Sequence, residues 1–126
     1  MKKLFIALFA LVSVGVSAQT IKWPSGAATL VTPAYAATYN VNVANNLTYI
    51  AMDSLTGTLT LNQGTVTATN GASVYIAVTA KAATRGVVFG TNIEGVTDSV
   101  AANKTVIYQL MKMGTKLIYI GKGAQN

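Results

Sequence analysis

Few residues in this sequence could perform chemistry, and three carboxylates, Asp53, Glu94 and Asp98, are the main ones. The 126-residue chain has no His and no Cys, which excludes Ser-His-Asp and Cys-His nucleophiles, ordinary zinc sites and a disulfide framework. A glycosidase needs two carboxylates about 5 to 10 Å apart, one with a raised pKa. Glu94 and Asp98 could meet in one loop, but so local a pair is more typical of a turn, or at best of a weak calcium site with too few oxygens. We therefore expect no catalytic residue, no cofactor and no metal site, and predict that the protein is not an enzyme.

Aromatic residues form a second class of candidates, because Trp23 and the six tyrosines could stack on sugar rings or bases. Most of the tyrosines fall inside predicted strands, where aromatic rings pack against cross-strand neighbours. Trp23 is the exception, since it lies outside any strong strand, in the segment Ile21-Lys22-Trp23-Pro24. It is a candidate contact residue, either on an N-terminal arm that docks on a neighbouring copy or as a cover over the end of the fold.

The first 18 residues have the three parts of a signal peptide: Lys2 and Lys3, an apolar run, and the small-residue pattern Val16-Ser17-Ala18 before Gln19. The apolar run is shorter than the roughly 20 residues that a membrane span needs. We therefore predict an exported protein, extracellular and located on a virion or a cell surface. Its domains would be a signal peptide at 1–18 and a single domain at 19–126 that begins with a short arm, 19–27.

The end of this segment resembles signal peptides of Bacteroidota, which very often leave Gln as the first mature residue. Two tripeptides, Asp53-Ser54-Leu55 and Asp98-Ser99-Val100, are similar to the Asp-Ser/Thr-aliphatic signal for O-glycosylation in that phylum. This resemblance makes Ser54 and Ser99 candidate O-glycosylation sites. The alternative is that each Asp-Ser pair starts a turn through side-chain to backbone hydrogen bonds.

Nine basic and three acidic residues give a formal net charge of +6. The cations beyond the signal peptide are scattered singly, whereas a nucleic-acid site gathers Lys and Arg along one stripe with aromatic residues between them. We expect no nucleic-acid partner.

The pattern after the signal peptide has period two, and Thr, Val, Ile and Tyr alternate with small or polar residues. It predicts strands at 28–32, 38–43, 47–52, 58–61, 65–69, 73–80, 86–89, 104–112 and 116–120. In the strand at 73–80 the branched aliphatic residues Val74, Ile76 and Val78 share one face, which is expected to point to the core. Turns are predicted at Asn45-Asn46, Asn62-Gln63-Gly64, Asn70-Gly71 and Met113-Gly114, the last of these in a hairpin.

The strand at 104–112 is apolar on both faces, since Val106, Tyr108 and Leu110 alternate with Ile107, Gln109 and Met111. A strand with one wet face would not carry that pattern. We therefore expect it either at the centre of a two-sheet fold or at a subunit interface.

Short strands separated by turns every 8 to 12 residues predict an all-β fold, an antiparallel β-sandwich or small jelly roll. A domain of this size buries only about two-thirds of its unfolded surface. Because 52% of the residues are hydrophobic, apolar surface remains outside and favours a homo-oligomer, with a trimer as the preferred state.

The stretch from Gly57 to Gly121 resembles a β-sandwich module of bacteriophage virion proteins of the head decoration, head fibre and tail-fibre tip type. The resemblance rests on pattern, and the matching segments are Thr58-Leu59-Thr60-Leu61, the strand at 74–79, Arg85-Gly86-Val87-Val88-Phe89-Gly90, Ala102-Asn103-Lys104-Thr105, and Met113-Gly114-Thr115 with the strand that follows. It implies a virion structural protein that contacts other virion or surface proteins, and no binding residue is carried over. The signal peptide departs from this family, because most phage capsid proteins are not exported.

Two functions are consistent with these features. The first is a non-enzymatic phage virion component that self-assembles and contacts the host surface, with glycan as a candidate partner. The alternative is a secreted bacterial carbohydrate-binding or adhesin domain.

Overall fold

The computed structural model describes residues 28–125. The predicted signal peptide at 1–18, the arm at 19–27 and Trp23 lie outside the described residues. Ten strands and no helix make up the described part, so the prediction of an all-β fold is confirmed. None of these residues forms a helix of the length and hydrophobicity that a membrane span requires.

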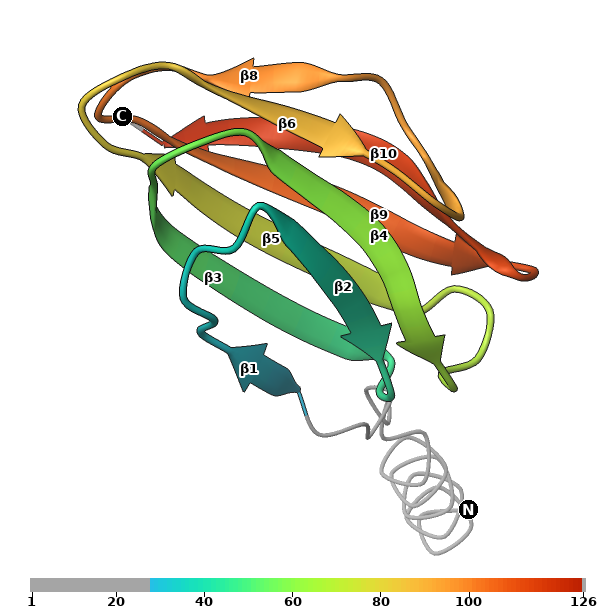
Figure 1. Cartoon of the computed structure of the whole chain (residues 1–126). Helices are drawn as coiled ribbons and strands as arrows, with labels where there is room; N and C mark the ends of the chain where they lie inside the picture. Colours follow the sequence, from blue (N-terminus) through green and yellow to red (C-terminus); the bar gives the residue numbers. More distant parts are fainter. Residues whose placement is uncertain (1–27, 126) are drawn as a thin grey trace, which may run out of the picture.

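The strands form two sheets that lie face to face (Figure 1). Sheet A has the order β1-β3-β5-β9-β10-β7 and sheet B has the order β2-β4-β6-β8. The bounds are β1 (Thr29–Val31), β2 (Thr38–Val43), β3 (Leu47–Leu55), β4 (Leu59–Val66), β5 (Ser73–Ala80), β6 (Arg85–Phe89), β7 (Ile93–Glu94), β8 (Asp98–Val100), β9 (Thr105–Met113) and β10 (Lys116–Gln125).

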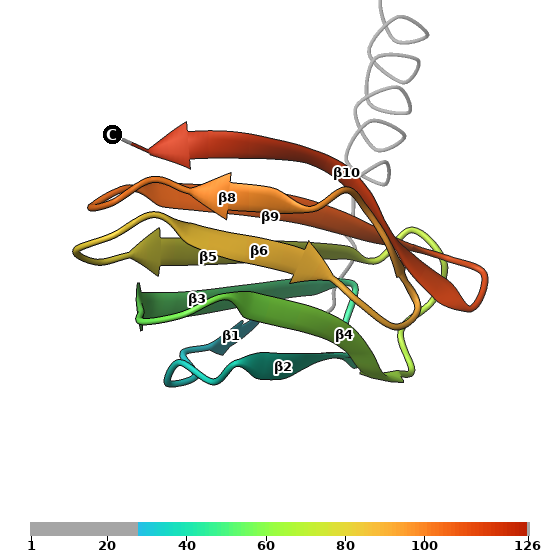
Figure 2. The same ribbon diagram turned by 45° about the horizontal axis from the view of Figure 1, so that its top comes forward.

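From β1 to β6 the chain alternates between the sheets, as a coil does. Every second strand therefore runs in the same direction. β1, β3 and β5 are parallel in sheet A, and β2, β4 and β6 are parallel in sheet B. Figure 2 shows β2, β4, β6 and β8 stacked from bottom to top, with the strands of sheet A behind them. The arrangement is therefore solenoid-like, and the prediction of an antiparallel β-sandwich or jelly roll is wrong in its connectivity. Alternating hydrophobicity indicates which side chains point inward but not which sheet receives the next strand.

The last part of the chain reverses this direction. β8 pairs antiparallel with β6, and β9 pairs antiparallel with β5. β9 and β10 then form the predicted hairpin, in which Gly114 adopts a φ of +64°, a conformation that glycine takes without steric cost. This return places β9 between β5 and β10. The position is central within sheet A, as one of the two expectations had it, but sheet B covers only the inner face of the strand.

The inward side chains of both sheets make one core. Val74, Ile76 and Val78 of β5 are fully buried, as their alternation indicated. The core residues are Val41, Val43, Ile50, Met52, Leu55, Leu59, Leu61, Ala68, Ala72, Val74, Ile76, Val78, Ala80, Val87, Ile93, Val100, Val106, Tyr108, Leu110 and Leu117.

The strand predictions agree with β2 and β5 at both ends, and the Asn70-Gly71 turn is confirmed. The turn predicted at Asn62-Gln63-Gly64 is wrong, because these residues lie inside β4, which joins two predicted strands. The Asn62 side chain accepts a hydrogen bond from the Thr91 backbone N–H at 2.9 Å. This asparagine therefore links neighbouring coils instead of shaping a turn.

Thr48 is the one polar residue among the buried residues of the described part, with 1% of its surface exposed. Its hydroxyl finds no hydrogen-bond partner among the described residues, and an unpaired buried hydroxyl destabilises the folded state. We expect Thr48→Val to raise the free energy of unfolding by about 1 kcal/mol in urea denaturation. The control is Thr79→Val, which removes a hydroxyl that is paired with that of Thr105 at 2.7 Å and should not stabilise. A less stable Thr48→Val protein would contradict the prediction.

Candidate functional site

The carboxylates singled out in the sequence do not come together. Glu94 lies on β7 of sheet A and forms an ion pair with Lys116. Asp98 lies on β8 of sheet B and forms an ion pair with Lys122. Each carboxylate thus has its own lysine, and the arrangement does not provide the acid and base pair that hydrolysis of a glycosidic bond requires. The described residues contain no group of three or more side chains suited to hold a metal ion.

Asp98 is the centre of a polar cluster at the edge of the core. It accepts hydrogen bonds from the Tyr108 hydroxyl at 3.0 Å and from the Lys122 ammonium at 2.7 and 2.9 Å. Partial burial alone would raise the pKa of Asp98, but the bonds from Lys122, the Ser99 backbone and Tyr108 outweigh it and hold this pKa below its usual value. Burial and the hydrogen bond to Asp98 raise the pKa of Tyr108 far above its usual range. The cluster therefore stays charged and paired near neutral pH and ties sheet B to sheet A.

The two candidate O-glycosylation sites differ in accessibility. Ser99 is exposed on β8, at the edge of sheet B. Ser54 is half-buried and has a φ of +65° at an irregularity in the pairing of β3. A modifying enzyme that acts on the folded chain could therefore reach Ser99 more easily than Ser54. Modification at either serine stays a prediction.

The outer face of sheet A carries exposed apolar and aromatic side chains. One residue from each of five neighbouring strands stands in the same row: Leu30, Tyr49, Tyr75, Gln109 and Gly121. The Tyr49 and Tyr75 rings are stacked, with centroids 5.5 Å apart. Leu30 is 69% exposed and Tyr49 is 40% exposed. Aromatic side chains in strands thus pair across strands as expected, but this pair does so on the outside of the fold.

The next row continues this surface with Ala51, Ala77, Ile107 and Gly123. We use the name A face for the outward side chains Leu30, Tyr49, Ala51, Tyr75, Ala77 and Ile107. They line a shallow cavity of about 290 Å³. No other described element lies on the A face, because sheet B packs against the opposite side of sheet A (Figures 1 and 2).

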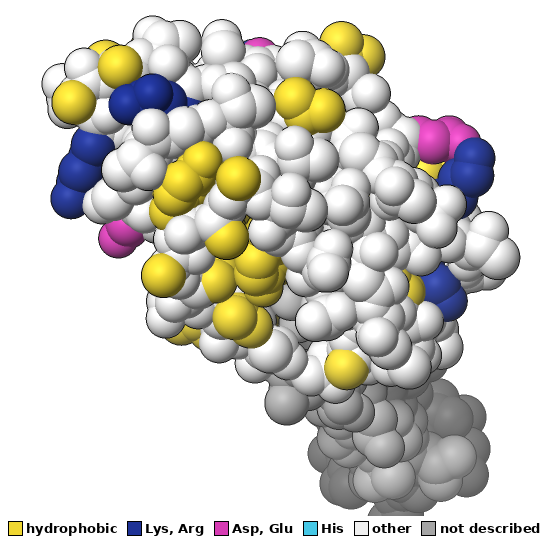
Figure 3. Space-filling view, viewed as in Figure 1, with side chains coloured by type: hydrophobic (Ala, Val, Ile, Leu, Met, Phe, Trp, Pro, Cys, Tyr) yellow, Lys and Arg dark blue, Asp and Glu magenta, His cyan; other side chains and the backbone are white. Residues whose placement is uncertain are grey.

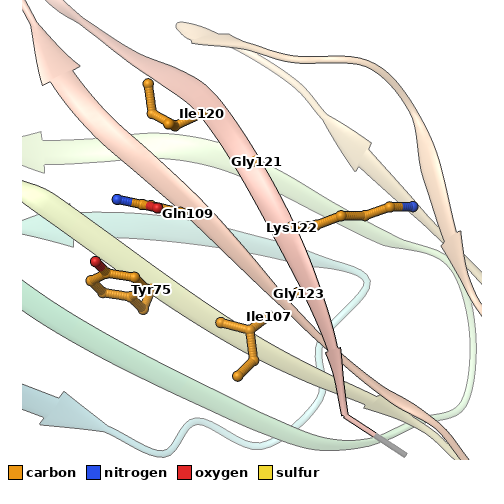
Figure 4. A pocket seen from close by; sticks show the side chains of 7 residues that line it. All are labelled: Tyr75, Ile107, Gln109, Ile120, Gly121, Lys122 and Gly123. Atoms are coloured by element: carbon orange, nitrogen blue, oxygen red, sulfur yellow. The ribbon is translucent and has the colours of Figure 1, made fainter.

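A trough adjoins the A face along β10. It has a volume of about 430 Å³ and is lined by Tyr75, Ile107, Gln109, Ile120, Gly121, Lys122 and Gly123. Figure 4 shows the Tyr75, Ile107 and Gln109 side chains on one side of β10, whereas Lys122 extends to the other side, toward its partner Asp98. Two polar side-chain groups therefore face the trough, the Tyr75 hydroxyl and the Gln109 amide.

No protein-family model and no curated protein matches this sequence. The resemblance to virion modules therefore stays a prediction.

The outer face of sheet B has a different character. Its outward residues are mostly Thr and Asn, among them Thr38, Asn40, Thr60 and Asn62, with Val88 beside them. Figure 3, which looks onto the side of β2 and β4, shows a surface that is largely neither hydrophobic nor charged, with hydrophobic side chains in one band left of the centre and in smaller groups elsewhere. Because the outer face of sheet B is mostly polar, the apolar character of the A face is not a general property of the surface.

Sequence reasoning identified part of this site. The two-sided pattern of β9 indicated that Ile107 and Gln109 are covered, but Leu30, Ile120 and the two glycines of β10 were not recognised. Their signal is the register, which brings residues from β1, β3, β5, β9 and β10 into one row and cannot be read from the sequence without the strand order.

Proposed function

We propose that this chain is a non-enzymatic structural or surface protein that assembles with copies of itself through the A face. The observation that carries the proposal is the row of apolar and aromatic side chains that crosses sheet A in register. β9 is buried on its inner side, and Ile107 and Met111 on its outer side are apolar as well. Apolar residues on both faces are typical of strands that are covered on both sides, so a partner on the A face accounts for the pattern.

Within this class we favour an exported phage virion component of the decoration or fibre type. The predicted signal peptide, the resemblance of the stretch from Gly57 to Gly121 to virion modules, and a surface suited to assembly support it. Its partners would be copies of this chain, with a trimer favoured, and other virion or surface proteins. Mass spectrometry of particles, outer membranes and medium, with a search for the peptide that begins at Gln19, distinguishes a virion location from a cellular one.

The stacked pair of Tyr49 and Tyr75 with the Gln109 amide beside it favours a second candidate, a secreted carbohydrate-binding or adhesin domain. Sugar rings have apolar faces that pack on aromatic rings, and their hydroxyl groups pair with amides. A glycan array with the wild type and with Tyr75→Ala tests this function. Binding that Tyr75→Ala abolishes would favour it over assembly.

The test of assembly is a matched pair of substitutions. Ile107 is half-buried on the A face, and Val88 is half-buried on the outer face of sheet B. We expect Ile107→Lys to convert the oligomer to monomer in light scattering and Val88→Lys to leave the mass unchanged, because only the first places a charge in the proposed contact. A wild-type protein that stays monomeric at high concentration, or equal masses for the two variants and the wild type, would overturn the proposal.

A further inference from the structure

The two glycines that border the trough are not explained by the fold. Gly121 and Gly123 lie within β10, and neither has a positive φ. A Cβ atom at either position would meet no atom within 4 Å. Neither backbone conformation nor packing within the described part therefore requires glycine here. A glycine inside a strand often marks a place where a ligand or another backbone approaches closely.

The shape of the trough indicates what approaches. Ile120, 49% exposed, stands at one end of the trough and Ile107 at the other, with Gln109 and Tyr75 between them. An aromatic side chain that can pack against Tyr75 and donate one hydrogen bond suits these walls, since an indole combines a large apolar ring with a single N–H donor.

The chain carries such a group in residues 19–27. Trp23 is its only tryptophan, and Ile21 stands two positions before it, so both would point to the same side of an extended segment. We infer that residues 19–27 of one copy lie across the A face of a neighbouring copy, with Trp23 in the trough. This inference rests on the proposed function, because it supplies the contact through which copies join.

The length of the arm is sufficient. Trp23 stands six positions before Thr29, the first residue of β1, and an extended chain covers about 20 Å over these six steps. The A face from β1 to β10 spans four strand spacings, about 19 Å. The arm is therefore long enough to span the distance from β1 to the trough, and the mixing experiment below distinguishes the trough of a neighbouring copy from that of its own chain.

The size of the A face indicates that copies join through exchanged arms and not through direct contact of two A faces alone. The A face and the adjoining trough together are about 19 Å wide and two outward rows, about 13 Å, long, which gives an area on the order of 250 Å². A stable interface buries about 800 Å² on each partner. Two A faces alone fall well short of this area, whereas arms exchanged between copies add their own surface to the contact, at little cost in new structure.

The first measurement uses the fluorescence of Trp23 in the full chain. We expect an emission maximum typical of a shielded indole in the wild type, and a shift to longer wavelength with loss of the oligomer in Gly121→Val. The valine fills the trough in open space and suits a strand, so folding is retained. Thr38→Val, exposed on the outer face of sheet B, is the control and should change neither emission nor mass. An oligomer in which Gly121→Val alters neither property would overturn this inference and leave assembly through the A face standing.

The second measurement mixes two variants. The Trp23→Ala variant lacks the indole but has an open trough. The Gly121→Val variant has a filled trough but keeps Trp23 on its arm. If the arm is exchanged, each variant alone is monomeric, and the mixture forms one-to-one pairs with Trp23 shielded again. If mixing changes nothing, exchange is excluded. A monomeric wild type whose Trp23 is shielded until Gly121→Val exposes it would mean that the arm lies on its own chain, which would overturn both the exchange and the assembly.

Discussion

Replacing Tyr108 with alanine is expected to lower the free energy of unfolding by about 3–5 kcal/mol, the range for deleting a buried aromatic ring. Tyr108 has no exposed surface and packs edge to face against Phe89, with ring centroids 5.6 Å apart. Tyr119 completes the group at 6.4 Å from Tyr108. Because these rings come from β6, β9 and β10, the cavity would open between the two sheets. Urea denaturation followed by circular dichroism measures the loss.

Tyr108→Phe separates the ring from its hydroxyl. It keeps the packing and removes the hydrogen bond to Asp98, whose side chain is 24% exposed and keeps its bond to Lys122. We expect a loss of about 1 kcal/mol for this variant. A Phe variant as unstable as the Ala variant would show that the ring is not the main contribution.

The pH dependence identifies the hydroxyl contribution. The pKa of Asp98 is lowered in the folded protein, so its charged form is favoured by folding and its contribution is fully present above the unfolded-state pKa of about 4. That contribution is lost as the pH falls through the lower folded-state pKa. The difference between wild type and Tyr108→Phe should therefore be constant from about pH 4 to about pH 10, where unfolded tyrosine begins to ionise, and shrink below about pH 4. A difference that persists unchanged in acid would contradict a role for the Asp98 carboxylate.

The sequence allowed the faces of the strands to be predicted more reliably than their order. Val74, Ile76 and Val78 were assigned to the core from period-two alternation alone, because a pleated strand turns successive side chains to opposite sides. The Met113-Gly114 hairpin followed from local turn chemistry. The parallel connectivity could not be predicted, since it depends on contacts between coils that lie far apart in the sequence.

The strands in the segment between Gly90 and Ala102 also could not be predicted from the sequence. It was interpreted as a loop that holds Glu94 and Asp98, but it contains the short strands β7 and β8. Two and three residues are too few for a visible alternation. These strands are specified by their partners, β10 and β6, which only the folded chain brings near.

Asparagine and glycine residues supply a second kind of contact between coils. The Asn62 amide oxygen accepts the Thr91 N–H at 2.9 Å, and the Asn42 amide oxygen accepts the Thr65 N–H at 2.8 Å. Each asparagine lies over a glycine of the next coil, where a Cβ on Gly90 or on Gly64 would overlap its amide oxygen. The same pair of residue types thus recurs on successive coils. In sequence it has the composition of a turn, which is why β4 was divided in two.

Asn62→Ala is therefore expected to lower the free energy of unfolding by about 1–2 kcal/mol, because it leaves the Thr91 N–H without its partner. Gly90→Ala should cost a similar amount for the same reason, since its methyl group displaces the Asn62 amide, and Gly90 has no positive φ that would add backbone strain. The double variant should lose clearly less than the sum of the two, because both changes remove one hydrogen bond. Asn42→Ala with Gly64→Ala provides the matched cycle one coil earlier and should give the same result. Additive losses in both cycles would mean that asparagine and glycine stabilise the coils independently, whereas a shared loss would show that this pair holds each coil in register with the next.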